Sequence, residues 1–369
     1  MLFVDDDQLV LDGLAASLRK MRRQWSMEFV CGGAAAVARI RKSKVDAVVT
    51  DMRMPGVDGE AVLLLARARW PASLRIILSG QTERAVVQRT IGVAHQFLSK
   101  PCGVDELQHC LQKLLDVVTP LAEETRVVVC GAGNVPVSSL ALACLSRLRV
   151  EPADDMASVA SCIEQDGGLS AKLLHVASGG FFAARQSVTS VASALAVLGL
   201  DTTLAVLLAL PSGAQDQRTI RLAQHTQATA QLLERSLGGA DARLCGVLHS
   251  VGKLILLDHF GTAYGELLER VEQSPDLPLH QLERERFGMS HDVVGAAVVE
   301  LWGISPALAE AIRTYSDPCV AARSTELAGA LHLACAVARG CTTLDQTLLA
   351  RSARVARIAA LFAATKSGI

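Results

Sequence analysis

Short apolar runs alternate with segments whose apolar positions recur every three or four residues along the first third of the chain. This alternation predicts strands that are each followed by a helix, and the short connections predict one parallel sheet. Five such units form a doubly wound α/β domain with a five-stranded parallel sheet. We expect strands over residues 2–4, 28–31, 46–50, 74–78 and 95–99, and helices over residues 8–21, 34–43, 59–69, 82–91 and 104–117.

Beyond residue 135 the apolar positions follow the helical period, and no strand alternation is convincing. This pattern predicts an all-α helical bundle. Pro120, Pro136 and the turn cluster Gly131-Ala132-Gly133-Asn134 are typical of a linker. We therefore expect an α/β domain over residues 1–119, a linker over 120–135 and an all-α domain over 136–369. Its helices are expected over residues 138–148, 156–165, 169–177, 188–198, 203–210, 218–237, 241–257, 264–272, 279–287, 291–301, 306–315, 327–338 and 344–364.

Four of the expected strands end at polar side chains. Asp5 and Asp6 follow the first strand, Asp51 the third, Ser79 the fourth and Lys100 the fifth. The carboxyl ends of parallel strands meet at one edge, where open α/β sheets bind ligands. Crowded carboxylates need a cation, and Mg²⁺ prefers oxygen ligands. A carboxylate beside Mg²⁺ can attack phosphorus while a hydroxyl and an ammonium stabilise the phosphoryl oxygens. An acidic edge without chemistry is the alternative, but four polar groups in register favour a site.

Residues 1 to about 118 resemble the receiver domain of response regulators, over the whole segment and in the same order. The resemblance implies that Asp51 is the phospho-acceptor. It also implies that Asp6, Asp51 and the backbone carbonyl of Arg53 hold Mg²⁺, while Asp5 acts through water.

The same resemblance assigns roles to the last two strands. Ser79 and Lys100 are expected to contact the phosphoryl group, and Lys100-Pro101 resembles the family's cis peptide. Phe97 occupies the aromatic position that rotates inward when Ser79 moves, so Ser79 and Phe97 form the expected switch. The surface that would respond to it runs from Thr82 to Val117.

Composition narrows the functional classes. The net charge is −1, and 20 Lys and Arg against 24 Asp and Glu after residue 120 give no basic excess of the kind that nucleic-acid binding requires. The 10 cysteines include no Cys-x-x-Cys pair, and no secretory signal is recognised, so we expect buried thiols and a cytoplasmic protein. The apolar stretch 194–210 is interrupted at Asp201, which predicts buried helices rather than a membrane span. Because Met1 lies directly before the first expected strand, we expect either a start further upstream or a short strand.

Five segments of the second half resemble the HDOD family, between about residues 135 and 318. HDOD domains are related to the HD phosphohydrolases but generally lack their metal site, and here Ser178-Gly179 stands where Asn-Ser is usual in the family. The matching segments are residues 166–174, 194–200, 246–254, 291–296 and 301–304.

Three histidines fall where HD enzymes place metal ligands. These are His225, His249 and His291. A working HD site needs a carboxylate after the second histidine, and this chain has Ser250 there. Cys335 stands at the late aspartate position. Three histidines can hold zinc in principle, but histidines hydrogen-bonded in a helical core are the favoured interpretation, so no cofactor is expected in the all-α domain.

The resemblances together imply a response regulator of a two-component phosphorelay. A sensor histidine kinase is the expected phosphoryl donor, and the HDOD domain is expected to act by binding an unknown protein partner. The receiver is a candidate for homodimer formation. Two alternatives stay open: an HD-type phosphohydrolase acting on a nucleotide such as cyclic di-GMP, and a transcriptional regulator. Arg351, Arg354 and Arg357 share a helix face that fits a solvated surface better than a nucleic-acid contact.

Overall fold

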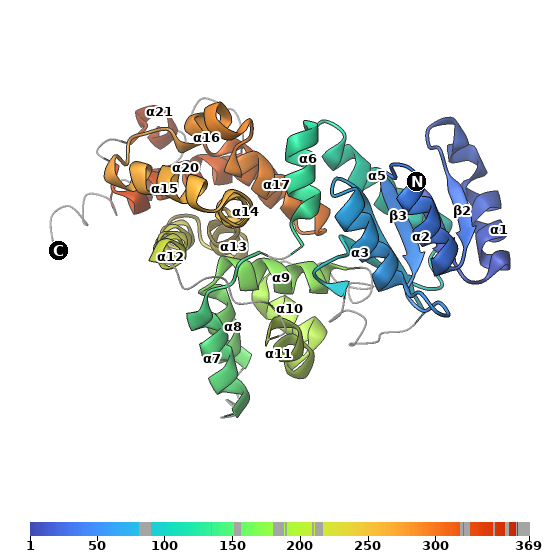
Figure 1. Ribbon diagram of the computed structural model, residues 1–369. Helices are drawn as coiled ribbons and strands as arrows, with labels where there is room; N and C mark the ends of the chain where they lie inside the picture. The colour runs from blue at the N-terminus through green and yellow to red at the C-terminus, as the bar shows by residue number, and fades with distance from the viewer. Residues whose placement is uncertain are drawn as a thin grey trace. The chain divides into compact units, whose positions relative to one another are not determined.

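The computed structural model describes residues 1–80, 90–133, 135–150, 156–179, 188, 190–208, 210, 217–317, 320, 325–341, 344–350, 354–358 and 360. The chain divides into two compact units, each considered by itself (Figure 1). The first unit comprises Met1–Gly133 with Val176–Ser187 and Leu301–Gly303, and the second comprises Asn134–His175, Val188–Glu300 and Ile304–Ile369.

The first unit contains a five-stranded parallel sheet, as the alternation predicted. The strand order is β2-β1-β3-β4-β5, and every neighbouring pair is parallel. The register aligns the strand ends, because Asp51 pairs with Leu78 and Ser79 pairs with Ser99. Polar residues at these positions therefore meet at one edge. The strands are β1 (Leu2–Asp5), β2 (Glu28–Cys31), β3 (Ala47–Asp51), β4 (Leu74–Ser79) and β5 (Gln96–Ser99).

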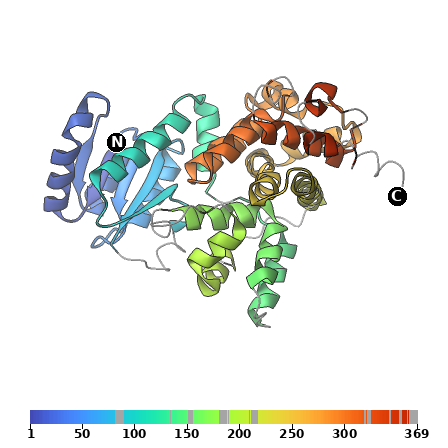
Figure 2. The same cartoon turned by 180° about the vertical axis from the view of Figure 1, so that it is seen from behind.

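Helices cover both faces of this sheet. Figure 1 shows α2 and α3 in front of the strands, and Figure 2 shows α5 on the opposite face. The expected helix over residues 8–21 is α-helical only to Ser17 and continues as a 3-10 turn, η1 (Leu18–Arg23). The expected helix over residues 82–91 lies mostly outside the described residues. The helices are α1 (Gln8–Ser17), α2 (Gly33–Lys42), α3 (Gly59–Arg69), α5 (Val104–Val118) and α6 (Glu123–Gly131).

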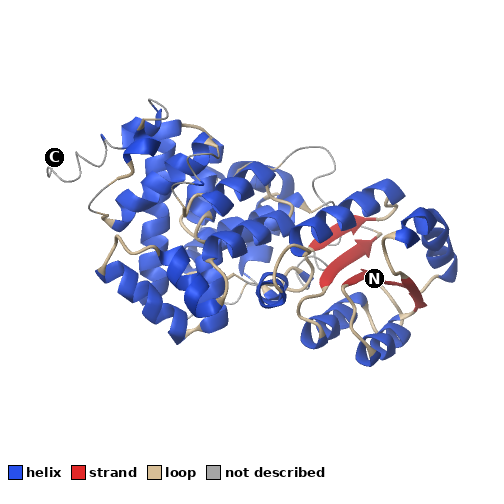
Figure 3. Cartoon of the chain, turned by 90° about the horizontal axis from the view of Figure 1, so that it is seen from above, coloured by secondary structure: helices blue, strands red, loops and turns tan. Residues whose placement is uncertain are grey.

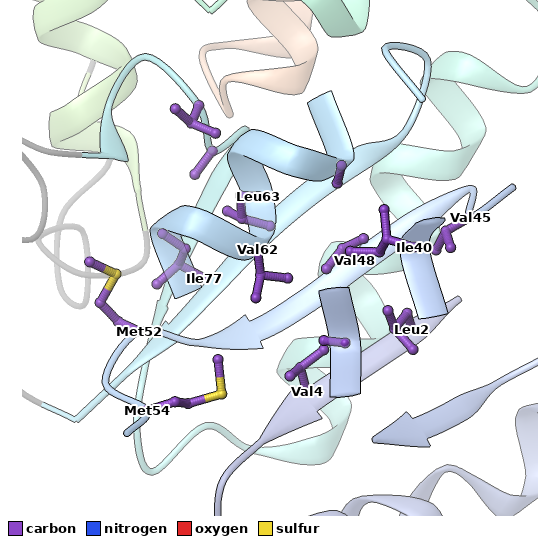
Figure 4. Close-up of a cluster of buried hydrophobic side chains, with 14 of the residues drawn as sticks. Leu2, Val4, Ile40, Val45, Val48, Met52, Met54, Val62, Leu63 and Ile77 are labelled. Atoms are coloured by element: carbon purple, nitrogen blue, oxygen red, sulfur yellow. The ribbon is translucent and has the colours of Figure 1, made fainter. Parts of the chain in front are cut away.

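A buried apolar layer between the sheet and helices α2 and α3 forms one core of this unit. Figure 4 shows Ile40 from α2 and Val62 and Leu63 from α3 directed onto strand residues such as Val48 and Ile77. Alternate residues of a strand point to opposite faces, so one face of each strand supplies this layer. The layer fixes the strand ends that carry the polar residues.

Helix α6 lies where the sequence predicted a linker. Its Cys130 is buried, and the Cys130 carbonyl accepts a hydrogen bond from Nη2 of Arg75 on β4 (2.5 Å). The Arg75 guanidinium also donates to the carbonyls of Val93 and Ser73, at 2.6 and 2.8 Å. Burial lowers the pKa of Arg75 to about 10. Residues 123–131 therefore belong to the first unit as a helix fixed by a buried cation.

The described part of the second unit consists of helices joined by loops, as Figure 3 shows by colour. Its first helices differ little from the expectation. They are α7 (Ser139–Val150), α8 (Met156–Glu164), α9 (Gly167–Ser178), α10 (Val191–Leu198), α11 (Leu200–Leu208) and α12 (Gln217–Leu237). No single described helix is long and apolar enough to cross a membrane; α10 and α11 pass that test only as a pair, and they are bent by 107°.

The later helices contain one clear correction. The expected helix over residues 241–257 is two helices, broken at His249 and Ser250. The expected helix over 344–364 is described only in pieces: α21 spans Gln346–Leu349, residues 354–358 and 360 are also helical, and residues 351–353, 359 and 361–364 lie outside the described residues. These helices are α13 (Ala240–Leu248), α14 (Val251–Phe260), α15 (Thr262–Gln273), α16 (Leu279–Phe287), α17 (His291–Leu301), α18 (Pro306–Thr314), α20 (Glu326–Arg339) and α21 (Gln346–Leu349).

Candidate functional site

An acidic pocket lies at the carboxyl ends of the strands in the first unit. Asp5 at the end of β1 is 3% exposed, and Asp51 at the end of β3 is 8% exposed. The Lys100 ammonium donates to both carboxylates, with a Nζ–Oδ2 distance of 2.6 Å to Asp5. Oxygens from two strands therefore converge on one positive group, which is the arrangement a small hard cation also needs.

Backbone groups fix the Asp51 carboxylate. The amide of Arg53 donates to Asp51 Oδ2 at 2.6 Å. Gly59 begins α3 against the end of β3, where an added Cβ would lie 2.2 Å from the Asp51 carbonyl oxygen. Only a residue without a side chain permits this approach, so Gly59 sets the position of α3 beside the pocket. The side chain of Asp58 caps α3 by accepting from the Ala61 amide at 3.0 Å.

The other expected pocket residues have distinct surroundings. Ser79 is buried at the end of β4, and its carbonyl accepts from the Lys100 amide at 2.7 Å. Asp6 is exposed beside Asp5. The peptide bond between Lys100 and Pro101 is cis, as the resemblance implied. Phe97 is 1% exposed within the apolar core, so its ring does not lie on the surface in this structure.

Charge dominates this pocket. Burial of the Lys100 ammonium disfavours its charged form, but the hydrogen bonds to Asp5 and Asp51 outweigh burial and hold the pKa of Lys100 above its ordinary value. Lys100 therefore stays protonated at neutral pH, beside a buried carboxylate that can act as a nucleophile. An ammonium in this place can also donate to an anionic group that arrives at Asp51.

A histidine cluster lies in the second unit. It consists of His225 on α12, His249 after α13 and Cys335 on α20, and one ligand atom from each lies within 4.8 Å of the others. The rings of His225 and His249 are 5.5 Å apart. Cys335 was identified in the sequence only as a replacement for an aspartate, and the structure places its sulfur beside two imidazoles.

Two glycines bring the helices of this cluster close together. A Cβ on Gly246 would lie 2.4 Å from Cα of Ala230 on α12, and one on Gly252 would lie 1.9 Å from the His291 carbonyl oxygen on α17. His249 lies three residues from each glycine. The break between α13 and α14 thus falls where two close helix contacts meet, and it directs His249 between His225 and Tyr315.

Both imidazoles of the histidine cluster are neutral at physiological pH. Burial, followed by the nearby Lys253 charge, holds the pKa of His225 and that of His249 well below the ordinary value. Hydrogen bonds to the backbone of Ala338 and Gly246 oppose these shifts without reversing them. Burial raises the pKa of the Cys335 thiol, although Lys253 and Arg339 act in the opposite direction. In the described structure, Nε2 of each of these histidines is buried without a hydrogen-bond partner.

His291 belongs to a different buried network. Its Nδ1 lies 2.6 Å from Glu283 Oε2, and its Nε2 lies 2.7 Å from the Tyr315 hydroxyl. The Glu283 carboxylate also accepts from the Tyr264 hydroxyl at 2.5 Å and from the His291 amide at 3.0 Å. His291 therefore has a carboxylate partner, Glu283, which comes from α16, eight residues earlier in the chain.

Ser250 does not replace the carboxylate that an HD site requires. Its hydroxyl is hydrogen-bonded with the Thr226 hydroxyl at 2.8 Å, inside the helical core. Asp292 receives hydrogen bonds from the Ser290 hydroxyl and from the Val293 amide.

Two family models match this chain. A response regulator receiver domain model matches residues 1–112, and an HDOD domain model matches residues 136–318. This chain is a response regulator with a receiver domain and an HDOD domain. The acidic pocket belongs to the receiver domain. His225, His249 and Glu283 lie within the HDOD match, whereas Cys335 follows it.

Individual relatives agree with the receiver domain. The hydrogenase transcriptional regulatory protein HoxA of Cupriavidus necator is 32% identical over 105 residues, which are 27% of this chain and 22% of HoxA. The response regulator MprA of Mycolicibacterium vanbaalenii is 32% identical over 123 residues, covering 32% of this chain and 52% of MprA. The matches span only part of these curated relatives.

A solved structure agrees with the fold over a longer stretch. The MmoQ response regulator of Methylococcus capsulatus is 24% identical, with a TM-score of 0.50, over 61% of this chain and 97% of that chain. At this identity the likeness concerns the fold, and it spans more of this chain than the receiver domain alone.

The sequence anticipated the receiver pocket better than the HDOD network. The structure brings Asp5, Asp51 and Lys100 together, and it separates His291 from the pair His225 and His249. Glu283 was not predicted from the sequence, because nothing in the charged helix Leu-His-Gln-Leu-Glu-Arg-Glu-Arg-Phe distinguishes one buried glutamate from its exposed neighbours. Lys253, which is buried one turn after His249, was not predicted either.

Proposed function

We propose that the receiver domain accepts a phosphoryl group at Asp51 from the phosphohistidine of a sensor histidine kinase. We further propose that it controls an HDOD domain that acts by binding a protein partner. The observation that supports this most strongly is the Lys100 ammonium held between Asp5 and Asp51, with Ser79 at the end of the next strand. The pocket offers a nucleophile, a cation and a hydroxyl at one sheet edge.

The transfer itself needs little from the chain beyond position and charge. An Asp51 oxygen attacks phosphorus, the bond from phosphorus to the kinase histidine nitrogen breaks, and that imidazole takes up a proton. Asp5, Asp6, Asp51 and the Arg53 carbonyl would hold Mg²⁺, which neutralises charge on the phosphoryl oxygens when it is bound. Lys100 and Ser79 donate to those oxygens, so Lys100 exchanges one carboxylate partner for the phosphoryl group.

The output step is expected to begin at Ser79. Movement of this hydroxyl toward the phosphoryl group changes the packing around Phe97 on the neighbouring strand. The responding surface was expected over residues 82–117, of which 82–89 lie outside the described residues. A phosphoryl group can shift a domain equilibrium only by its different affinity for the two states. We expect the phosphorylated receiver either to form a homodimer or to free the HDOD surface for its partner.

Phosphoryl uptake at Asp51 is the direct test. Acetyl phosphate with Mg²⁺ should add one phosphoryl group to the full chain, as read by intact mass. Asp51→Asn should abolish the added mass, because an amide oxygen is a poor nucleophile. Asp116→Asn is a matched control, since Asp116 is an exposed acid on α5. Retention of the phosphoryl group by Asp51→Asn would refute the assignment.

Control of the HDOD domain requires a separate measurement. Beryllofluoride with Mg²⁺ should change the small-angle scattering profile or the sedimentation coefficient of the wild-type chain, and should leave Asp51→Asn unchanged. Phe97→Ala should weaken the response without preventing phosphoryl uptake. If shape and oligomeric state stay constant while Asp51 is fully occupied, the receiver does not act on the HDOD domain in this way.

A further inference from the structure

We propose that His225, His249 and Cys335 bind one zinc-class transition metal ion in the helical unit. The three residues come from α12, the α13–α14 break and α20, and their ligand atoms lie within 4.8 Å of one another. Nitrogen and sulfur atoms from three separate segments of the chain thus lie close together. This assignment goes beyond the proposed function and does not depend on it.

The hydrogen bond of His249 fixes which nitrogen is free to bind a metal. Nδ1 lies 2.6 Å from the carbonyl oxygen of Gly246, which can only accept, so Nδ1 carries the proton and donates it. Nε2 consequently carries a lone pair. Metal-binding histidines are commonly held in this manner, with the second ring nitrogen donating to a backbone carbonyl.

The free nitrogens need a partner. Nε2 of His225 and Nε2 of His249 are both buried, and neither has a hydrogen-bond partner within the described structure. Leaving a polar atom buried and unpaired destabilises the folded chain, so such atoms are uncommon unless a water or ion occupies the site. Two of them beside one thiol indicate a shared occupant.

The ligand types select the metal. Two imidazoles and a thiolate suit Zn²⁺, whereas Mg²⁺ and Ca²⁺ prefer oxygen ligands. Binding converts the Cys335 thiol to a thiolate and releases its proton to solvent. A divalent ion with one thiolate keeps a net positive charge, and a tetrahedral ion with three protein ligands keeps one open position.

Two cavities adjoin the cluster. Cys335 lines a cavity of about 600 Å³, and His225 lines a second one of about 410 Å³. Lys253 and Arg339 line both cavities, so two basic side chains lie beside the site; the carboxylates of Asp276, Asp317 and Asp345 also line the larger cavity. We expect the fourth ligand to be a water, a hydroxide or a small anion.

His291 lies outside the ligand set. Both of its ring nitrogens are already paired, one with Glu283 and the other with Tyr315. The site is therefore a two-histidine, one-cysteine site, and its thiol comes from beyond the HDOD match. It differs in this way from the carboxylate-containing site of the HD enzymes.

Cobalt provides a direct probe of the site. The full chain is stripped of metal with a chelator and titrated with Co²⁺, and absorption is recorded in the near-ultraviolet and visible ranges. A tetrahedral site with a thiolate gives intense visible bands and a sulfur-to-cobalt charge-transfer band. One equivalent of Zn²⁺ should bleach these bands. Elemental analysis of protein purified without chelator should give about one zinc per chain.

Variants separate this site from other thiols. Cys335→Ser should remove the charge-transfer band, and His249→Gln should weaken metal affinity by at least about tenfold. Cys341→Ser is the matched control, because Cys341 is buried, lines the same cavity as Cys335 and lies outside the ligand set. Asp51→Asn should bind Co²⁺ like the wild-type chain, which distinguishes this site from the receiver pocket. Far-UV circular dichroism checks that each variant remains helical.

The wild-type chain alone can overturn the proposal. If the folded protein gives no charge-transfer band with Co²⁺ and contains no stoichiometric zinc, a water or a thiol hydrogen bond occupies the cluster instead. A charge-transfer band that persists in folded Cys335→Ser would equally exclude this ligand set.

Discussion

The receiver pocket and the histidine cluster bury polar groups in opposite ways. In the receiver, two carboxylates converge on the Lys100 ammonium, so the chain itself supplies the balancing charge. In the cluster with Cys335, Nε2 of His225 and Nε2 of His249 have no hydrogen-bond partner among the described residues. A pocket that contains its own ammonium group can bind an anionic group, whereas converging lone pairs are suited to bind a cation. We therefore expect a phosphoryl group in the receiver pocket and a metal ion in the histidine cluster.

The HDOD domain itself contains both arrangements. Hydrogen bonds link Tyr264, Glu283, His291 and Tyr315 into one network, whereas Nε2 of His225 and Nε2 of His249 have no partner in the part of the chain that the structure describes. Paired buried networks specify one packing arrangement, and unpaired buried groups mark places where something else binds. We thus expect the Glu283 network to stabilise the helical core and the neighbouring histidine cluster to bind a ligand.

Removing the Glu283 carboxylate should have the largest effect on stability. Glu283→Ala leaves the Tyr264 hydroxyl, His291 Nδ1 and the His291 amide without their shared acceptor. Loss of one member of such a buried charged network costs about 3–5 kcal/mol. We therefore expect the helical unit to unfold at a lower urea concentration, as monitored by far-UV circular dichroism.

A second glutamate on the same helix provides the control. Glu285 lies on the same helix and is exposed, so Glu285→Ala should change stability by less than about 0.5 kcal/mol. Equal losses in the two variants would show that the carboxylate of Glu283 does not hold the network together. Phosphoryl uptake at Asp51 should be normal in both variants.

Lys100→Met tests the internal cation of the receiver, with a smaller expected effect. It leaves Asp5 and Asp51 close together without their shared donor and removes one donor to the phosphoryl oxygens. By analogy with loss of one oxyanion donor, phosphoryl transfer from acetyl phosphate should slow by about 100-fold, or about 2.7 kcal/mol. The rate at which the intact mass increases measures phosphoryl transfer.

Lys113→Met is the control, because Lys113 lies on α5, and this variant should gain mass at the wild-type rate. If Lys100→Met also gains mass at nearly the wild-type rate, Lys100 does not take part in the transfer.

The receiver could be predicted because its information is local. Asp51, Ser79 and Lys100 each end a recognisable strand, and a parallel sheet necessarily places those ends at one edge. The family models confirm the receiver and HDOD domains. The roles of the individual residues stay predictions until they are measured.

The helical unit could not be predicted to the same depth. The helical period runs without interruption through His249 and Ser250, so the sequence indicated one helix where the structure has two. The pairing of Glu283 with His291 depends on the turn between α16 and α17 and has no periodic signature. Residues 123–131 were assigned to a linker because Pro120, Pro136 and a turn cluster surround them, but packing of Arg75 against the Cys130 carbonyl stabilises them as a helix. Tertiary contacts decided all three cases.

The smallest effect should be a difference in acid sensitivity between the two regions. Burial, followed in effect by the Arg339 charge, lowers the pKa of His332 in the helical unit, although its hydrogen bond to Tyr315 and the carboxylates Asp345 and Asp317 act the other way. Below pH 6.5, the unfolded chain therefore binds a proton that folded His332 does not. Stability must fall as the pH drops below 6.5, by no more than about 1.4 kcal/mol per pH unit for one histidine.

The contribution of Lys100 to the stability of the receiver does not change over the same pH range. The pKa of Lys100 is raised, so its contribution to stability is complete below the ordinary value and is lost only as the pH rises through the higher folded value. Between pH 7.5 and 5.0 it stays constant.

His332→Gln isolates the acid-sensitive contribution of the helical unit. Nδ1 of His332 donates to the Tyr315 carbonyl at 2.8 Å, and a glutamine amide can donate there without titrating. The free energy of unfolding of the wild-type chain and of His332→Gln is measured in urea at pH 7.5 and at pH 5.0. The decrease between the two pH values should be larger for the wild-type chain by about 1 kcal/mol. Taking the difference cancels contributions from the other histidines, such as His280, whose pKa is also lowered by burial. Equal losses would mean that His332 titrates alike in the folded and unfolded chains, and that the contrast between a charged receiver pocket and a neutral helical core does not extend to this side chain.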